Sequence, residues 1–134
     1  MDYIQYKTAI QRLGDMLDAY RHNDQRPPLE QEAVQDSLIK RFEYTLETAW
    51  KTCKRHLEAE GFVEAKTGSP KSIIRLAAQR NLLSNPEAWF GYLQFRQDTW
   101  CNGSIHKTTA EMDTIEHFFS DVVSLYQRMT GTLD

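Results

Sequence analysis

The segment Lys40–Glu58 constrains the fold most, because it is a long stretch of helix-forming sequence without glycine or proline. Its apolar and small side chains recur every three or four residues along two adjacent stripes. One stripe contains Phe42, Thr45, Ala49, Cys53 and His56, and the other contains Ile39, Leu46, Trp50 and Leu57. A surface helix needs only one such stripe. The segment is therefore expected inside a helical bundle, with neighbours on both sides or with one neighbour and a partner chain.

Length and charge narrow the class of protein. A chain of 134 residues is expected to form one domain, spanning 1–134, with a core of its own. The formal net charge of −3 provides no overall positive field to attract nucleic acid, although a local basic patch remains compatible with it. Two cysteines without CxxC spacing fit a reducing compartment. No apolar run approaches the roughly 20 residues of a membrane span, and the N-terminus lacks a signal-peptide pattern, so we expect a cytoplasmic protein.

Periodicity and capping residues divide the chain into helices. No alternating strand pattern is present, so the sequence predicts an all-α, up-and-down antiparallel bundle of four to five helices. The second helix would be about 45 Å long and is expected to be bent or interrupted. The first predicted helix runs from Tyr3 to Arg21, and the second from Leu29 or Glu30 to Gly61. A short third helix begins at the Ser69-Pro70 cap, and a fourth begins at the Asn85-Pro86 cap and frays after Arg96. The last helix begins at a Thr108/Glu111 capping box.

Three stretches together resemble a known family. RFEYTLETAWKTCKRHLE, GSPKSIIRLAAQRNLL and NPEAWFGYLQFR are similar in order and spacing to the nucleotidyltransferase substrate-binding proteins, which are related to the HepT and HEPN domains. The similarity spans roughly residues 3–128. The positions that match the family are Arg41, Phe42, Glu43, Trp50, Lys51, Ser69, Pro70, Arg75, Trp89 and Arg96. The resemblance implies a homodimeric helical subunit, without a cofactor of its own, that pairs with a separate minimal nucleotidyltransferase carrying the catalytic carboxylates.

The sequence departs from the family in RQDTWCNGSIHKT, which begins at Arg96. HEPN ribonucleases use an arginine and a nearby histidine on RNA. Here the histidine position falls on Cys101, or on His106 if five residues are inserted, and neither alignment keeps the tyrosine that is modified with AMP in HepT-type toxins. Arg96 and His106 are candidates for phosphodiester cleavage. The alternative is that Arg96 pairs with helix carbonyls or a carboxylate while His106 is solvated in a loop.

Other side chains suggest binding surfaces, each with an ordinary structural alternative. Lys51, Lys54 and Arg55, with Arg75 nearby, fit a small anion site or simply a solvated helix face. Trp50 and Trp89 fit base stacking, or else anchors of the core or of an interface. Two i, i+4 pairs, Glu43 with Glu47 and Asp113 with His117, lack the facing Glu-x-x-His elements of bundle metal sites, so no metal is expected.

Three functions follow from these patterns. The favoured one is a non-catalytic subunit that binds substrate for a partner nucleotidyltransferase, as part of a two-component or toxin–antitoxin-like module. The alternatives are an RNase toxin using Arg96 and His106, and a stand-alone bundle that binds a small molecule. The surplus of aromatic side chains, which cannot all face one small core, favours an interaction surface. The residues expected to bind substrate or partner are Arg41, Trp50, Lys51, Lys54, Arg75, Trp89 and Arg96.

Overall fold

The computed structural model describes residues 2–102 and 109–131, with side chains described for 2–98 and 111–131. Within these ranges the chain is helical and has no strand, which confirms the predicted all-α class. Two short 3-10 turns lie between the first helices, at Asn23–Gln25 and Val63–Ala65. The helices are α1 (Ile4–Arg21), α2 (Pro28–Ala59), α3 (Pro70–Gln79), α4 (Pro86–Asn102) and α5 (Thr109–Thr130).

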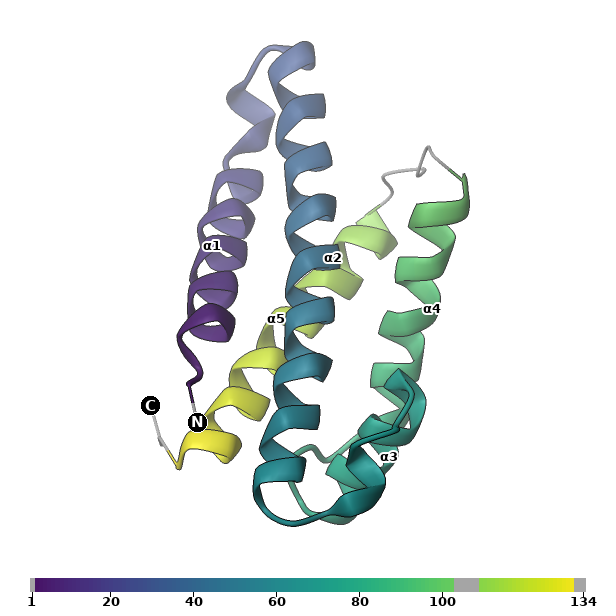
Figure 1. The fold of residues 1–134 in the computed structure, drawn as a ribbon. Helices are drawn as coiled ribbons and strands as arrows, with labels where there is room; N and C mark the ends of the chain where they lie inside the picture. The colour runs from purple at the N-terminus through teal and green to yellow at the C-terminus, as the bar shows by residue number, and fades with distance from the viewer. Residues whose placement is uncertain (1, 103–108, 132–134) are drawn as a thin grey trace.

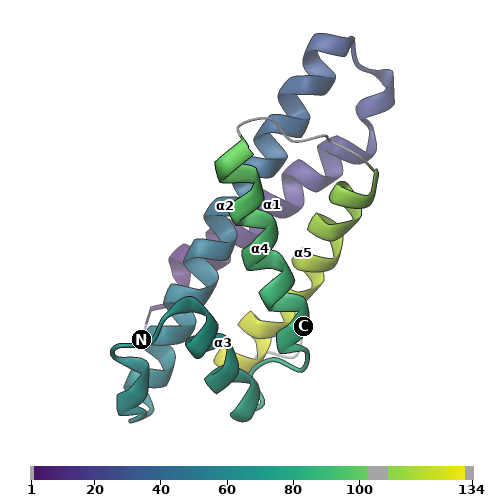
Figure 2. The ribbon, with the colours of Figure 1, turned by 90° about the vertical axis from the view of Figure 1, so that its right-hand side faces the viewer.

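The long helices alternate in direction. Helix α1 and helix α2 lie side by side and run antiparallel, and α4 then runs opposite to α2 on its other flank (Figure 1). Helix α5 returns obliquely behind α2. Its Tyr126 ring lies 5.9 Å, centroid to centroid, from the Tyr6 ring of α1. Figure 2 shows α4 between α2 and α5, with the short α3 at the end where α2 finishes. The predicted up-and-down bundle is therefore confirmed. No helix in the described part of the chain is long and apolar enough to cross a membrane.

Helix α2 begins at a proline and ends at a glycine. Pro28 occupies the first turn, where its missing N–H costs nothing. At the other end the Gly61 N–H donates to the Glu58 carbonyl (3.0 Å) and the Phe62 N–H to that of Leu57 (3.1 Å), which is a Schellman motif. Gly61 takes a φ of 98°, which a residue with a Cβ rarely adopts. Of the two outcomes expected for this helix, bent or interrupted, an interruption is not found: with no glycine or proline after Pro28, α2 continues for 32 residues.

The side-chain caps predicted for the next two helices are present. Ser69 Oγ accepts from the Ser72 N–H at the start of α3 (3.3 Å), and Asn85 Oδ1 accepts from the Ala88 N–H at the start of α4 (3.3 Å). Helix α4 extends to Asn102, further than predicted, because no proline or glycine follows Gly91 before residue 103. The predicted capping residue of α5, Thr108, lies outside the described residues.

Both apolar stripes of α2 are covered from within the chain, except at Trp50, which is half-buried. Helix α2 packs against α1, α3, α4 and α5, so the first of the two alternatives for its second stripe is the one observed. An aromatic cluster joins α2, α4 and α5: the Phe118 ring lies 4.7 Å from Phe42, 5.1 Å from Tyr92 and 6.1 Å from Trp89, centroid to centroid. These edge-on contacts set the position of α4 against α2.

Hydrogen bonds from tyrosines tie the other helices to this core. The buried Tyr6 hydroxyl on α1 donates to the Val122 carbonyl on α5 (2.6 Å), and the Tyr92 hydroxyl on α4 donates to Asp121 on α5. Burial raises the pKa of both phenols, in Tyr92 together with the neighbouring carboxylate. The bundle thus presents α2 between two fixed neighbours, α1 and α4.

Candidate functional site

A polar cluster bridges α2 and α4. One oxygen of Glu47 accepts from Arg96 Nη1 on α4 (3.2 Å) and from the Trp50 indole N–H (3.2 Å), and the other pairs with Lys51 Nζ (2.9 Å). We call these four residues the Glu47 cluster. Three of them stand at i, i+3 and i+4 on one face of α2, which is why a single carboxylate reaches both neighbours. The cluster contains two cations and one anion, so its net charge is positive.

The electrostatics of Glu47 reflect its partners. Partial burial alone would raise the pKa of its carboxyl group, but the hydrogen bonds from Lys51 and Trp50 and the charge of Arg96 lower that pKa below the ordinary value. Glu47 is therefore a carboxylate at neutral pH. Because its side chain is about a third exposed (30%), the pair with Arg96 is a partly solvated one.

Two cavities flank this ion pair. One, of about 460 Å³, lies at the N-terminus of α3, and we call it the α3 pocket. The other, of about 520 Å³, lies along α2, and we call it the α2 pocket. Arg96 lines the first and Glu47 the second. The α3 pocket is lined by Ser69, Pro70, Lys71, Leu93, Arg96 and Gln97, and the α2 pocket by Gln5, Tyr44, Glu47, Thr48, Trp50, Lys51, Lys54 and Arg55.

The predicted anion site on α2 is only partly assembled. Lys51, Lys54 and Arg55 line one cavity, the α2 pocket. Lys54 also pairs with Glu58 (2.8 Å), one turn along the helix. Arg75 is not among the residues that line this pocket; its guanidinium lies over the Phe90 ring, 5.2 Å from the centroid, and holds α3 to α4. The structure therefore separates Arg75 from the three α2 cations.

The two candidate tryptophans have different surroundings. Trp50 is half-buried at the edge of the α2 pocket and uses its indole N–H on Glu47. Trp89 is 2% exposed and packs edge-on against Tyr92 and Phe118. Its ring has no free face for a base, so Trp89 occupies a core position, one of the alternatives that its sequence context allowed.

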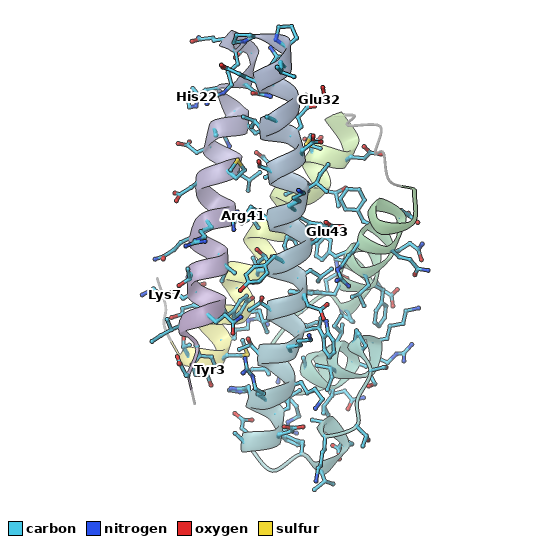
Figure 3. The ribbon with its side chains drawn as sticks, turned by 45° about the horizontal axis from the view of Figure 1, so that its top comes forward. Tyr3, Lys7, His22, Glu32, Arg41 and Glu43 are labelled. Carbon is cyan, nitrogen blue, oxygen red and sulfur yellow. The ribbon has the colours of Figure 1, made fainter. Side chains whose placement is uncertain are left out.

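A third cavity lies between α1 and α2. It has a volume of about 460 Å³ and we call it the Arg41 pocket. Figure 3 places Arg41 on the side of α2 toward α1 and Glu43 on the opposite side, toward α4. Arg41 is predicted from the sequence as a binding residue, whereas Arg12, which lines the same cavity from α1, is not, because nothing in the spacing links two positions on different helices. The lining residues are Gln5, Thr8, Ala9, Arg12, Arg41 and Tyr44.

The remaining candidates concern catalysis and metal binding. Arg96 pairs with a carboxylate, as one of its two interpretations expected, whereas His106 lies outside the described residues, so their separation is not defined. The carboxylate that holds Arg96 belongs to Glu47, for which the sequence suggested only a possible role as a metal ligand. Among residues 2–98 and 111–131, no group of three or more His, Cys, Asp or Glu side chains is arranged to hold a metal ion.

Comparison with protein families shows to which family the chain belongs. The family model described as "Nucleotidyltransferase substrate binding protein like" matches residues 1–131. The chain belongs to this family. The resemblance seen in the three sequence stretches is thereby confirmed.

Two solved structures share the fold of this nucleotidyltransferase substrate-binding-like chain. HI0074 from Haemophilus influenzae, described as having the fold of a substrate-binding domain of a nucleotidyltransferase, is 20% identical with a TM-score of 0.86, and the match covers 96% of this chain and 99% of that one. The protein ttk003001694 from Thermus thermophilus is 26% identical with a TM-score of 0.57, covering 96% and 95%. No match is found among curated proteins.

Proposed function

We propose that this chain is the substrate-binding subunit of a two-chain nucleotidyltransferase and that a separate minimal nucleotidyltransferase chain supplies the catalytic carboxylates. The observation that carries the proposal is the family match over residues 1–131. The fold shared with HI0074 over nearly the whole of both chains supports it. In this proposal the chain acts by holding substrate and partner, with no cofactor of its own.

We assign the substrate to the α3 pocket. The cavity has cationic side chains on two sides, Lys71 from α3 and Arg96 from α4, together with the apolar wall of Leu93. A pocket with convergent polar groups and an apolar wall is the usual form of a small-molecule site. The pair with Glu47 supports a positioning role for Arg96, because it restrains the guanidinium of a residue that lines the cavity.

Assembly and cellular context belong to the same proposal. We propose a homodimer of this chain, in the cytoplasm, paired with the nucleotidyltransferase in a toxin–antitoxin-like or other two-component module. Large apolar side chains exposed on the isolated chain, Ile4, Leu29 and Val63, support contacts with other chains. No observation on the described residues favours the RNase alternative, which needs His106.

The test is a mass measurement by light scattering, on the chain alone and mixed with the minimal nucleotidyltransferase encoded beside it. We expect twice the 15.7 kDa chain mass for the chain alone and a larger, stable species in the mixture. A chain that keeps its own mass in the presence of that protein would overturn the partner role.

The assignment of substrate to the α3 pocket is tested by a substitution at Lys71, one of its lining residues. Lys71→Glu places an acidic group in the first turn of α3, where the helix dipole favours it, so the fold is preserved while the charge of the pocket is reversed. We expect the complex mass to be unchanged and nucleotidyl transfer by the complex to fall at least about tenfold, the loss of one charge-assisted contact. Lys40→Glu, an equal charge change at an exposed position of α2, is the matched control.

A further inference from the structure

The Arg41 pocket combines two guanidinium groups with no anion to balance them. Arg12 comes from α1 and Arg41 from α2, and both line one cavity of about 460 Å³. In the described part of the chain neither side chain forms an ion pair. Arg41 is moreover half-buried, so part of its hydration has been removed without a carboxylate in exchange. An arrangement of this kind gains stability when an anion enters.

The geometry of arginine narrows the anion. A guanidinium carries several N–H donors in a planar fork that matches the oxygens of phosphate or carboxylate in pairs. Two such forks that line one cavity from different helices provide more donors than the two oxygens of one carboxylate accept well, whereas a phosphate presents more acceptor oxygens to share between them. The cavity wall adds the Thr8 hydroxyl and the Gln5 amide. A phosphate group therefore fits the lining better than a carboxylate.

The neighbouring residues indicate what the phosphate is attached to. Gln5 and Tyr44 line both the Arg41 pocket and the α2 pocket, so the two cavities adjoin. The Gln5 amide donates to the Tyr44 hydroxyl (3.0 Å), which holds the Tyr44 ring between the cavities. Tyr44 is 47% exposed, which leaves its side chain accessible for a planar base to stack on.

The combined surface carries more cations than anions. Beyond Tyr44, the α2 pocket continues with Lys51, which pairs with Glu47, with Lys54, which pairs with Glu58, and with Arg55. Among the described residues that line the two cavities, Glu47 is the single carboxylate. Cations along a groove that also exposes an aromatic ring are the usual means of holding a nucleotide phosphate beside a stacked base.

We propose that Arg12 and Arg41 bind a phosphate group of a nucleotide and that the base stacks on Tyr44, at a site on the α1 side of α2 that is separate from the α3 pocket. The phosphate belongs either to a free nucleotide or to a short single strand of nucleic acid. Binding at this site concerns the chain by itself and does not require the partner enzyme. A negative result here therefore would not contradict the proposed role as a nucleotidyltransferase subunit, and the reverse also holds.

The experiment is calorimetric titration of the chain alone, at about 50 mM salt, where phosphate contacts are least screened. The probes are ATP, a short single-stranded oligonucleotide, inorganic tripolyphosphate and adenosine. We expect binding of ATP or the oligonucleotide, weaker binding of tripolyphosphate and none of adenosine. The comparison of ATP with the oligonucleotide identifies the source of the phosphate. A parent chain that binds none of the phosphate-bearing probes would overturn the proposal.

Variants then locate the site. Arg12→Gln and Arg41→Gln should each weaken binding at least about tenfold, the value of one charge-assisted contact. Arg12 is exposed, so its replacement leaves the fold intact even if Arg41→Gln disturbs it. The matched control is Lys7→Gln, the same charge change on the side of α1 away from the cavity (Figure 3), with an effect below about twofold. Equal weakening by Lys7→Gln and Arg12→Gln would contradict a localised site.

Tyr44→Ala tests the base. It should weaken ATP binding at least about fivefold, the lower range for one stacked base, and leave tripolyphosphate binding unchanged. If ATP and tripolyphosphate bind the parent equally and Tyr44→Ala affects neither, the stacking part of the proposal is overturned and the two arginines bind phosphate alone.

Discussion

The two flanks of α2 hold their arginines differently. Toward α4, Arg96 pairs with Glu47 at 3.2 Å. Toward α1, Arg12 and Arg41 line one cavity and form no ion pair with the described residues. Both flanks belong to the same helix, and on the α4 side the aromatic cluster around Phe118 holds the neighbouring helix in place. The paired arginine contributes to how the helices meet, whereas the unpaired arginines add nothing to the fold that the structure reveals and remain available to a ligand.

The pairing of Arg96 with Glu47 requires α4 to be held against α2, and the aromatic cluster around Phe118 holds it there. Phe118→Ala removes the ring that touches Phe42, Tyr92 and Trp89 and leaves a cavity at the junction of three helices. We expect the free energy of unfolding to fall by about 3–5 kcal/mol, the range for large aromatic truncations in cores. Urea unfolding followed by circular dichroism measures it. A loss below about 1 kcal/mol would mean that the cluster does not set the position of α4.

The next effect concerns the N-terminus of α3, which walls the α3 pocket. Ser69→Ala removes the side-chain cap on the Ser72 N–H. A loss of about 0.5–1 kcal/mol is expected, toward the low end for caps because the bond is long at 3.3 Å. Urea unfolding again provides the measurement, with the exposed Ser84→Ala as control. Equal stabilities of the two variants would show that the cap contributes nothing to α3.

Double-mutant cycles should distinguish the paired Arg96 from the unpaired Arg12 by the coupling energy of each with Glu47. Arg96→Gln and Glu47→Gln, alone and together, should reveal a coupling of about 0.2–1 kcal/mol, the usual range for a partly exposed pair. Arg12→Gln combined with Glu47→Gln should give a coupling near zero, because the two side chains belong to different cavities. A coupling for Arg12 as large as that for Arg96 would remove the distinction between the two flanks.

The sequence predicts the scaffold of this comparison well. Pro28 and Gly61 bracket α2, and the caps at Ser69 and Asn85 open α3 and α4, because these are local backbone rules that depend on few neighbours. For α4, the polar residues after Arg96 predict too early an end, because no proline or glycine follows Gly91 before residue 103 and the helix continues to Asn102. For α2, of the two expected outcomes, bent or interrupted, an interruption is absent, because no glycine or proline follows Pro28 within the helix.

The candidate site was harder to predict, because it depends on contacts between helices. The spacing of Glu47 and Lys51 was visible, but the arrival of Arg96 from α4 required the packing of α4 on α2. Arg12 could not be associated with Arg41 from periodicity, since they are on different helices. For Trp89 the sequence left base stacking and a core or interface position open, and only its aromatic contacts on α4 and α5 decide for the core.

The smallest expected effect is the pH dependence of the paired flank. Burial opposes the shift, but the bonds with Lys51 and Trp50 and the charge of Arg96 hold the pKa of the Glu47 carboxyl group below its ordinary value of 4.5 in the folded chain. A carboxyl group of this kind stabilises the fold above its ordinary pKa, and the contribution disappears as the pH falls through the lowered one. Solvent exposure limits the contribution to roughly a few tenths of a kcal/mol.

Parallel urea titrations of the parent and Glu47→Gln between about pH 7 and pH 3 isolate this contribution, because the other carboxyl groups titrate in both proteins. The parent should be the more stable at neutral pH, and the difference should shrink toward zero as Glu47 takes up its proton below its ordinary pKa. Arg41→Gln supplies the contrast: with no carboxylate paired to it, its stability difference from the parent should stay constant over the same range. A constant difference for Glu47→Gln as well would mean that its carboxylate charge does not hold Arg96 to α2.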